Sequence, residues 1–463
     1  MSNREIRIRT ASKKPISLSY TDTELKIANE RVFHIPLRQV IAARCDSRSL
    51  QLSYITNKKK AGALLLKKLV GTVEEVNDDV LDEWISSLLH MAYEGAGVKR
   101  GRRLKVLINP HGGTKQAVSI FNKTVEPILR AAQCALDVTH TTKRGHAYEI
   151  AKTMTLDYDA IVIVSGDGLI HEVLNGFAHH QQPLSAFRIP IAPIPAGTGN
   201  GLSLNILGVA DGFDVCAAAL NVVKGLPMNV DVFSLTQDGK RTISFMSQAM
   251  GLIADLDIGT ENLRWMGEAR FTYGLLRGLI QFKPCPVQLS YKAAESDKDK
   301  MFDTLQKQRI KEKAVSSLES QSPEFDDTAL PPLKYSTTDD DGWTVVDKPL
   351  LYVLAGKGPY IGRDFMAFPV SLPDDGLIDI NLQGLSSRSE IVLALGGAPK
   401  GDPYWKQSNE YIKAHAYRVT PLSSKGALAI DGEIFPFKEF QVETHQGLAT
   451  LLSPYGYYAA DFA

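Results

Sequence analysis

Apolar and polar side chains alternate in short runs over the first hundred residues. Residues 16–20 (Ile-Ser-Leu-Ser-Tyr) and 50–54 (Leu-Gln-Leu-Ser-Tyr) have the period of two that half-buried strands show. From Asn77 the period lengthens to that of a helix, because Trp84 and Leu88 recur one turn apart on an apolar face. The pattern predicts a β-rich domain over residues 1–100, made of small antiparallel strands and closed by one amphipathic helix.

Strand-like and helix-like segments then alternate from residue 104 to about residue 208. The predicted strands are 104–108, 136–141, 160–164 and 189–195, and the predicted helices are 115–133, 146–155 and 169–179. Alternation of this kind builds a parallel sheet with helices on its faces, so we expect an α/β domain over residues 103–225. Ligands of such sheets bind beyond the carboxyl ends of the strands, so the loops after the strands are where we look for chemistry.

Beyond residue 226 the apolar runs are shorter and of strand type. Residues 350–354, 377–382 and 449–452 are examples, and turn residues separate them, which predicts an antiparallel second domain over 226–463. Residues 293–348 differ from the rest of this domain, because they hold 13 acidic and 8 basic residues and few large apolar ones. That composition predicts a disordered acidic insertion or exposed loop.

The composition is typical of a folded protein, and the chain has no net positive charge that would attract nucleic acid. Of 463 residues 44% are hydrophobic, and 52 basic side chains balance 52 acidic ones. We therefore expect several domains with large cores and no nucleic-acid partner. The charge is uneven, since residues 1–103 carry 19 basic and 12 acidic residues. This basic front is either a solvated face or a surface drawn to anionic lipid headgroups.

Three features bear on the compartment. No run reaches the ~18 apolar residues that cross a bilayer, and the N-terminus lacks the apolar core of a signal peptide. The four cysteines lie far apart in the sequence and fit neither a zinc ribbon nor a dense disulfide framework. We expect a cytoplasmic protein whose contact with membranes is peripheral.

Three glycine-rich loops follow strands of the predicted parallel sheet. They are residues 109–114 (Asn-Pro-His-Gly-Gly-Thr), 165–168 (Ser-Gly-Asp-Gly) and 195–201 (Pro-Ala-Gly-Thr-Gly-Asn-Gly). Glycine lets the backbone approach a ligand closely, and the helix after such a loop offers free N–H groups to an anion. The second loop places the Asp167 carboxylate where it can reach that ligand. The loops predict a phosphate site, although the sequence contains neither a Walker pattern nor protein kinase motifs.

In chain order, the Asn-Pro-x-Gly-Gly loop, the run Ser-Gly-Asp-Gly-x-x-His-Glu-Val-x-Asn-Gly and the Pro-Ala-Gly-Thr-Gly-Asn loop resemble the catalytic signature of the diacylglycerol kinase and sphingosine kinase superfamily. The resemblance runs from about 104 to 460. It implies an α/β nucleotide domain and an antiparallel β-sandwich lipid domain, with the active site in the cleft between them. It also implies transfer of the γ-phosphoryl group of ATP to a lipid hydroxyl, with ATP and Mg²⁺ as cofactors.

The parts outside this match resemble a subset of the superfamily. The strands and single helix of residues 1–100 resemble a pleckstrin-homology-like module, and similar N-terminal additions and acidic insertions occur in fungal and plant long-chain base kinases. One loop departs from the family pattern, because His111 and residues 114–116 replace its more basic, glycine-richer end.

The resemblance assigns a role to each matched residue. Asp167 becomes the general base, which must lie within hydrogen-bond reach of the lipid hydroxyl. The positions around the nucleotide are Asn109, Gly112, Gly113, Thr141, Gly166, Glu172, Gly197, Thr198, Gly199 and Asn200, and those that hold its phosphates are Arg264 and Arg270. Guanidinium groups suit phosphates because they stay charged and bind in bidentate fashion. The Asp-Gly-Glu element matches at Asp431 and Glu433, with Glu433 favoured as the Mg²⁺ contact.

The stretch from residue 247 to residue 271 narrows the substrate, because it is similar to the corresponding segment of sphingosine kinases. By this similarity Ser247 and Asp257 bind the sphingoid headgroup, and Asp255 is a second carboxylate nearby. A sphingoid base carries a cationic amine beside its reacting hydroxyl, and an aspartate pairs with that cation by a charge-assisted bond. Ceramide kinases lack an acid at the position of Asp257. The implied reaction is phosphorylation of the primary hydroxyl of a sphingoid base to the 1-phosphate.

Each matched residue also has a plain structural interpretation. Asp167 could cap a helix, Arg264 and Arg270 could form surface ion pairs, and His171 is more typical of a packed polar histidine than of a second base. The joint occurrence of the motifs in family order favours catalysis. Two alternatives stay open: a kinase of another lipid such as ceramide or diacylglycerol, and a catalytically silent lipid-binding scaffold. The oligomeric state also stays open.

Overall fold

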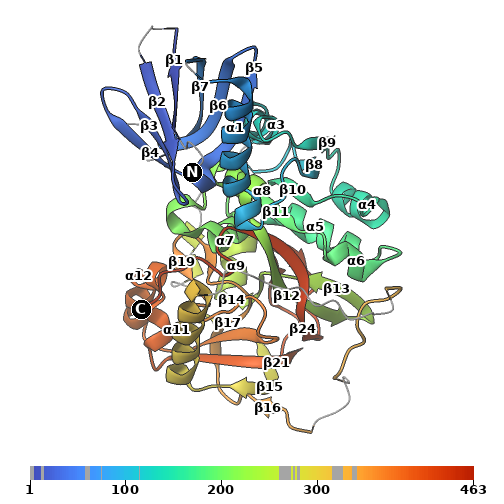
Figure 1. The fold of residues 1–463 in the computed structure, drawn as a ribbon. Coiled ribbons are helices and arrows are strands. Elements are labelled where there is room, and N and C mark those ends of the chain that lie inside the picture. The colour runs from blue at the N-terminus through green and yellow to red at the C-terminus, as the bar shows by residue number, and fades with distance from the viewer. Residues whose placement is uncertain are drawn as a thin grey trace.

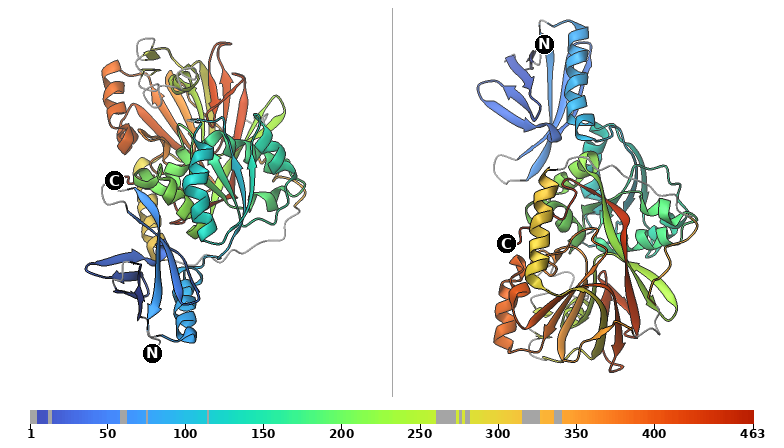
Figure 2. Two further views of the ribbon diagram at one scale, coloured as in Figure 1. Left: turned by 90° about the horizontal axis from the view of Figure 1, so that it is seen from above. Right: turned by 60° about the horizontal axis from the view of Figure 1, so that its bottom comes forward.

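The computed structural model describes residues 5–11, 15–57, 63–74, 76–113, 115–259, 273–274, 277–278, 282–314, 327–335 and 341–463. Three regions follow one another from one end of the molecule to the other, in chain order (Figure 1). They are an N-terminal sheet with a helix beside it, an α/β unit, and a β-rich region. The N-terminal sheet projects from the rest of the molecule in the further views (Figure 2).

The N-terminal region is an antiparallel sheet with the order β4-β3-β2-β1-β7-β6-β5. Its elements are β1 (Glu5–Arg9), β2 (Pro15–Tyr20), β3 (Glu24–Ala28), β4 (Val32–Pro36), β5 (Val40–Asp46), β6 (Ser49–Asn57), β7 (Leu64–Glu74) and the helix α1 (Asp78–Ala92). Asn77 starts α1, because its side chain accepts a hydrogen bond from the Val80 N–H. Trp84 then packs edge-on against Tyr20, with ring centroids 5.4 Å apart. The expected antiparallel β domain with a closing helix is confirmed.

The α/β unit contains the parallel sheet that the sequence predicts. Its strands are β8 (Arg103–Ile108), β9 (Ala135–His140), β10 (Ala160–Ser165) and β11 (Ile191–Pro195), and its helices are α2 (Ala117–Ile120), α3 (Glu126–Ala131), α4 (His146–Thr153), α5 (Asp167–Ala178), α6 (Pro183–Phe187), α7 (Gly201–Asp211) and α8 (Val215–Lys224). A π-helical turn at Phe121–Val125 joins α2 to α3. The strand order is β9-β8-β10-β11, so the chain changes direction across the sheet between β8 and β10. Ligands bind at such a switch point, and the first two glycine-rich loops follow these two strands.

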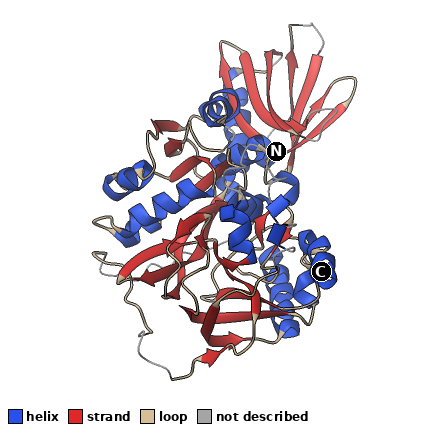
Figure 3. Ribbon diagram, turned by 180° about the vertical axis from the view of Figure 1, so that it is seen from behind, coloured by secondary structure: helices blue, strands red, loops and turns tan. Residues whose placement is uncertain are grey.

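The β-rich region continues from the same sheet. Its strands are β12 (Leu226–Gln237), β13 (Lys240–Ser244), β14 (Ser247–Gly251), β15 (Val287–Glu295), β16 (Thr344–Val345), β17 (Leu350–Gly356), β18 (Tyr360–Gly362), β19 (Phe365–Met366), β20 (Ile378–Gly384), β21 (Asn409–Pro421), β22 (Leu428–Ile430), β23 (Glu433–Phe435) and β24 (Phe440–Ser453). The long strand β24 pairs antiparallel with β12 and β21 and parallel with β11. It therefore joins the two units, and strands dominate the lower part of the molecule in Figure 3.

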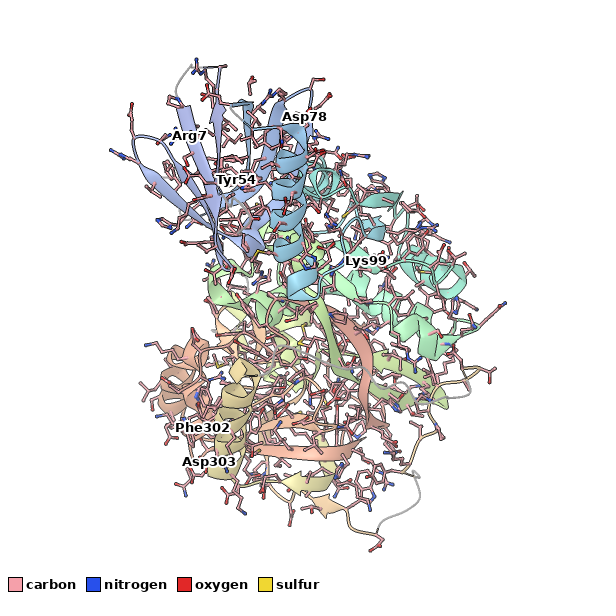
Figure 4. The ribbon with its side chains drawn as sticks, in the orientation of Figure 1. Arg7, Tyr54, Asp78, Lys99, Phe302 and Asp303 are labelled. Atoms are coloured by element: carbon pink, nitrogen blue, oxygen red, sulfur yellow. The ribbon has the colours of Figure 1, made fainter. Side chains whose placement is uncertain are left out.

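The helices of the β-rich region are α9 (Leu252–Gly259), α11 (Lys298–Ala314) and α12 (Arg388–Gly396). Helix α11 lies within residues 293–348, so the prediction of a disordered insertion is wrong for the first part of that range. Met301 and Leu305 of α11 are buried in the core, and Phe302, labelled in Figure 4, contacts the rings of Trp405 and Phe462. Tertiary packing stabilises a helix whose own sequence is strongly polar. Residues 315–326 and 336–340 of the predicted insertion lie outside the described residues.

Hydrogen bonds tie the N-terminal sheet to the α/β unit. Lys224 at the end of α8 donates to the Ala92 carbonyl at the end of α1 over 2.7 Å. Leu64 of β7 donates from its N–H to the Asp214 carboxylate over 2.9 Å. Buried apolar residues of both regions belong to one continuous core. The N-terminal region is therefore packed on the α/β unit as well as linked to it.

Of the helices in the described ranges, none is individually long and apolar enough to cross a membrane. Only α7 and α8 taken together have the required length and composition, and they are bent by 107° relative to each other.

Candidate active site

The three glycine-rich loops meet backbone to backbone. A Cβ atom built at Gly197 would lie 2.4 Å from the Gly166 Cα, and one at Gly113 would lie 2.8 Å from the Gly197 Cα. Gly113 also has a φ of +53°, which L side chains rarely adopt. Any side chain at these positions would separate the loops. Glycine is therefore needed to bring the carboxyl ends of β8, β10 and β11 into one site.

Two asparagines shape the loops from inside. Asn109 accepts hydrogen bonds from the His111 and Gly112 N–H groups over 3.1 and 3.0 Å. Asn200 accepts from the Gly197 N–H and donates to the Gly197 carbonyl, both over 2.9 Å. The side chains of Asn109 and Asn200 thus stabilise the conformation of their own loops, a role that the family match alone did not suggest. Thr198 and Gly199 lie between Gly197 and Asn200, and a Cβ at Gly199 would be 3.8 Å from the Asp167 Oδ2 atom.

Asp167 is the first residue of α5 and faces the third loop. Its Oδ2 accepts from the Gly201 N–H over 2.8 Å and its Oδ1 from the Leu202 N–H over 3.1 Å, so it caps the start of α7. Burial raises the pKa of the Asp167 carboxyl above its usual value, although these two N–H groups act in the opposite direction. The carboxylate is a stronger proton acceptor than an exposed aspartate. The structure thus gives Asp167 both the capping contact and a raised pKa.

Glu172 lies one turn further along α5 and binds backbone. Its two carboxylate oxygens accept from the Gly145 N–H over 2.9 Å and the Ala147 N–H over 3.1 Å. Glu172 therefore anchors the loop between β9 and α4, which also contains Thr141. Thr141 is buried, and its N–H donates to the Ile108 carbonyl over 2.8 Å. Both residues hold the loop after β9 in place beside the loop after β8.

Asp431 lies 260 residues after His171 in the chain and is bonded to it. His171 Nδ1 is 2.8 Å from the Asp431 Oδ2 atom. The Asp431 Oδ1 atom accepts from the Ser244 hydroxyl and from the Met246 and Ser247 N–H groups, over 2.9 to 3.0 Å. Burial lowers the pKa of His171, but the hydrogen bond and charge of Asp431 outweigh it and raise that pKa overall. The pair joins α5 to the turn that precedes β14 and to the hairpin of β22 and β23.

Glu433 sits on the same hairpin and faces the second loop. Its side chain is 31% exposed and forms an ion pair with Arg144, a residue of the loop after β9. A Cβ built at Gly168, the neighbour of Asp167, would lie 3.0 Å from the Glu433 Oε1 atom. The structure thus places Glu433 beside the catalytic candidate, whereas Asp431 is buried with its oxygens already accepting hydrogen bonds. Arg144 was missed at the sequence level, although it is a basic residue in a loop at the correct sheet edge.

The acidic groups fit a metal that is shared with phosphates. In the described part of the chain, no group of three or more His, Cys, Asp and Glu side chains is arranged to hold a metal ion. Mg²⁺ is usually bound by one or two carboxylates together with substrate phosphates and water. The partly exposed Glu433 carboxylate suits this arrangement.

The residues predicted for the lipid headgroup are only partly described. Ser247 is the first residue of β14, and its N–H donates a hydrogen bond to the Asp431 carboxylate. Asp255 lies on α9, and burial raises its pKa while Lys283 and Arg277 partly offset this effect. The side chain of Asp257, together with Arg264 and Arg270, lies outside the described residues.

Comparisons with known proteins agree with this geometry. Residues 103–235 match the diacylglycerol kinase catalytic domain family. Sphingoid long chain base kinase 4 of Schizosaccharomyces pombe is 32% identical over 427 residues, which are 91% of this chain and 88% of the relative. Human sphingosine kinase 1 is 30% identical over 366 residues, which are 76% of this chain and 91% of that protein.

A solved structure shares the fold. A Bacillus anthracis str. Sterne protein assigned as a diacylglycerol kinase aligns with a TM-score of 0.53 at 21% identity, and the alignment covers 77% of this chain and 96% of the other. The fungal match extends over more of this chain than the human one, consistent with the longer form expected from the sequence. On these grounds the chain, whose residues 103–235 match the diacylglycerol kinase catalytic domain, belongs to the sphingoid long chain base kinases.

Proposed function

We propose that the protein is an ATP-dependent kinase that phosphorylates the primary hydroxyl of a sphingoid base. One observation carries the proposal: Asp167, with its raised pKa, lies where three glycine-rich loops meet and beside Glu433 of the β-rich region. A base, a phosphate cradle and an acidic group for a metal are thereby within one site. The relatives named for this activity cover most of the chain.

The mechanism follows from the charges around the reacting atoms. Asp167 takes the proton of the lipid hydroxyl while the hydroxyl oxygen forms a bond to the γ-phosphorus. The bond between that phosphorus and the bridging oxygen of ATP breaks, and ADP leaves. Positioning of the two substrates supplies much of the acceleration.

The phosphates are held by backbone and by charge. The backbone of the loops containing Gly113, Gly166 and Gly197 lies close to the phosphates, since glycine allows this approach, and Arg264 and Arg270 bind the phosphate oxygens in bidentate fashion. When bound, Mg²⁺ neutralises charge on the phosphate oxygens. Glu433 would hold this metal, and Asp431 positions Glu433 through the hairpin and His171 through its ring.

Recognition of the lipid rests on its amine. Asp257 pairs with the ammonium group of the sphingoid base, Ser247 binds the neighbouring polar group, and Asp255 orients its neighbours. The acyl chain occupies an apolar pocket of the second domain, for which residues 271–282 and 360–368 supply candidate walls.

The proposal is tested by phosphate transfer from labelled ATP with Mg²⁺ to sphinganine, phytosphingosine, ceramide and diacylglycerol in parallel. We expect transfer to the free bases, lost in Asp167→Asn. Asp257→Asn should weaken use of the free bases specifically. Transfer to ceramide or diacylglycerol alone would contradict the role of Asp257, and no transfer to any lipid would favour a scaffold.

The finer architecture and the location belong to the same proposal. We propose a pleckstrin-homology-like module over residues 1–100, a nucleotide domain over 103–225 and a β-sandwich lipid domain over 226–463. The basic N-terminal region and the lipid substrate favour a cytoplasmic enzyme in peripheral contact with membranes. Pelleting of the full chain with vesicles of neutral or anionic lipid tests this contact, and equal pelleting with both would exclude an electrostatic attraction.

A further inference from the structure

Asn205, a buried residue in the middle of α7, joins the α/β unit to the β-rich region. Its amide pairs with both backbone groups of one residue, Tyr360 at the start of β18. The Asn205 Oδ1 atom accepts from the Tyr360 N–H over 2.7 Å, and the Asn205 Nδ2 atom donates to the Tyr360 carbonyl over 2.9 Å. Neither the sequence motifs nor the proposed mechanism gives Asn205 a role.

The close approach of β18 to α7 depends on Gly358. A Cβ atom there would lie 2.4 Å from the Asn205 Nδ2 atom, and the φ of Gly358 is +87°, which L side chains rarely adopt. The Asn205 carbonyl accepts from the Ala459 N–H over 2.7 Å, so the C-terminal segment packs on the same turn of α7. Asn205 and Tyr360 are both buried, so water does not compete for their hydrogen bonds.

The first turn of α7 connects Asn205 to the proposed base. The Gly201 N–H donates to the Asp167 carboxylate over 2.8 Å. β18 reaches this turn as well, because a Cβ atom at Gly201 would lie 3.3 Å from the Ile361 carbonyl oxygen. The four residues from Gly201 to Asn205 span about 6 Å of helix. One rigid turn therefore links the Asp167 carboxylate to β18.

On its other side, β18 leads to the residues proposed for the lipid. It follows β17 after three residues, and Gly356 at the end of β17 pairs with Ser247 at the start of β14. The proposed function assigns Ser247 to the sphingoid headgroup, and Tyr360 begins a segment that it assigns to the apolar pocket. The pairing of Asn205 with Tyr360 thus connects the lipid-binding strands to the helix whose start is bonded to Asp167.

The chemistry of asparagine suits a contact that must keep one register. The surroundings are apolar, since Leu204 and Tyr360 belong to a buried hydrophobic cluster. Apolar surfaces can slide over each other by small amounts, whereas a buried amide with both hydrogen bonds made specifies a single arrangement. A displacement of about 1 Å between reacting groups can cost about 10²-fold in rate. The register of β18 on α7 therefore bears directly on phosphoryl transfer.

Building on the proposed function, we propose that Asn205 is a positioning residue for this reaction. It fixes Tyr360, and with it the lipid-binding strands, at a set distance from Asp167. Asn205 contacts neither the nucleotide nor the lipid and acts through α7 and β18. By this link it holds the lipid hydroxyl within reach of the Asp167 carboxylate.

The first test separates the rate of transfer from nucleotide binding in Asn205→Ala. With sphinganine as the acceptor, kcat per folded molecule should fall about 10–100-fold, because the hydroxyl is displaced from the base. The folded fraction is measured by circular dichroism at the assay temperature. The dissociation constant for ATP, measured by calorimetry without lipid, should equal that of the wild type, because the three glycine-rich loops belong to the α/β unit.

The matched control is Asn221→Ala, which also removes a buried amide. Asn221 lies on α8 and donates to the Leu452 carbonyl of β24 over 2.8 Å. Its loss should lower the melting temperature and leave kcat per folded molecule unchanged. Asn205→Asp keeps the size of the side chain and the hydrogen bond from the Tyr360 N–H, so its kcat should lie between those of the wild type and Asn205→Ala. The aspartate variant decides the test if the alanine variant does not fold.

The second test approaches the same contact from β18 through a double-mutant cycle. Gly358→Ala directs a Cβ atom at the Asn205 amide and should lower kcat per folded molecule as Asn205→Ala does. In the Asn205→Ala background the amide is gone, so the second substitution should lower kcat little further. Independent effects, which multiply in kcat, would overturn the proposal.

The outcomes separate this inference from the proposed function. An unchanged kcat per folded molecule in Asn205→Ala would overturn the positioning role even if the wild type phosphorylates sphingoid bases. Weaker ATP binding in proportion to the loss of kcat would also overturn it, because Asn205 would then act on the nucleotide loops. A selective loss of kcat would support the role even if the wild type phosphorylated another lipid. A wild type that transfers phosphate to no lipid would overturn both.

Discussion

Asp167 and Asp431 belong to one site, yet their surroundings give them different chemistry. Asp431 is buried and accepts from His171, the Ser244 hydroxyl and a series of backbone N–H groups. Asp167 accepts two N–H groups, and burial raises its pKa. A carboxylate whose anion is destabilised by burial accepts a proton more readily, as the raised pKa of Asp167 indicates. At the scale of residues, the raised pKa of Asp167 suits the general-base role that we propose for it, whereas the hydrogen bonds of Asp431 hold His171 and the turn before β14 in place.

Asp167→Asn should reduce phosphate transfer by about 10²–10⁴-fold, the range typical for loss of a general base. The amide oxygen of asparagine can still accept one of the two backbone hydrogen bonds at the start of α7, the other N–H loses its acceptor, and the buried negative charge is removed. We therefore expect a loss of stability of no more than about 1–3 kcal/mol, measured by calorimetry. An inactive variant that also melts at a much lower temperature would mean that the carboxylate acts mainly as a cap.

The pair of His171 and Asp431 should make stability depend on pH. The pKa of His171 is raised above its ordinary value of 6.5, so the folded protein binds this proton more tightly than the unfolded chain. Its contribution to the free energy of unfolding is full below pH 6.5 and is lost as the pH rises through the raised pKa. His171→Gln should flatten the dependence measured in denaturant titrations above pH 6.5. The control is His90→Gln on α1, whose side chain is 68% exposed, and it should keep the wild-type slope.

At the scale of elements, the site depends on loops that touch through glycine. The glycine-rich pattern after three of the predicted strands was enough to anticipate three loops at one edge of the sheet. The contact of Gly166 with Gly197 was not predictable, because it depends on how β10 and β11 pair. Helix α11 was not anticipated, because its polar composition indicated disorder. The segment is helical, and Met301 and Leu305 pack into the core.

Gly197→Ala should destabilise the protein and weaken ATP binding. Its Cβ would lie 2.4 Å from the Gly166 Cα, a backbone atom that cannot move without separating β10 from β11. Overpacking of this kind costs about 1–3 kcal/mol. Gly199→Ala, two residues later, meets its nearest atom at an ordinary 3.8 Å and should unfold at the wild-type temperature. Equal melting temperatures for both variants would contradict the close approach of the loops.

The strands of the β-rich region share a buried ionic cluster. Lys357, with a side chain that is 0% exposed, pairs with Asp231 over 2.8 Å and also with Asp375. Lys357→Met should destabilise the fold by about 3–5 kcal/mol, since it leaves the buried Asp231 carboxylate without a counter-charge, while Asp375 keeps its ion pair with Lys413. Lys348→Met removes a partner of Glu410 from an exposed pair and should cost less than about 1 kcal/mol. Urea denaturation of the two variants measures the contrast, and a mild effect at Lys357 would contradict the buried cluster.

At the scale of the whole molecule, one core runs from the N-terminal sheet into the α/β unit, and β24 ties that unit to the β-rich region. The basic charge of the N-terminal region left open whether it binds lipid or packs on the catalytic unit. The contact of Lys224 with the Ala92 carbonyl shows that the N-terminal region packs on the α/β unit.

Lys224→Ala should weaken this contact. Lys224 is buried, and its loss leaves the Ala92 carbonyl without a donor, which costs about 1–3 kcal/mol. We expect a lower melting temperature for the full chain by calorimetry. Lys99, labelled in Figure 4, forms an exposed ion pair with Asp159, so Lys99→Ala should change stability by less than about 1 kcal/mol. A normal melting temperature in Lys224→Ala would mean that the shared apolar core and the Leu64–Asp214 hydrogen bond hold the two regions together without this contact.

The sequence by itself determined the alternation of strands and helices, the glycine-rich loops and the place of Asp167 after the third parallel strand. Periodicity and turn chemistry are encoded by neighbouring residues, so local reasoning can reach them. Only the tertiary structure decided that Glu172 binds backbone, that His171 pairs with Asp431 and that Arg144 meets Glu433. These partners lie from tens to hundreds of residues apart, and the pairing of strands, which no local pattern specifies, brings them together.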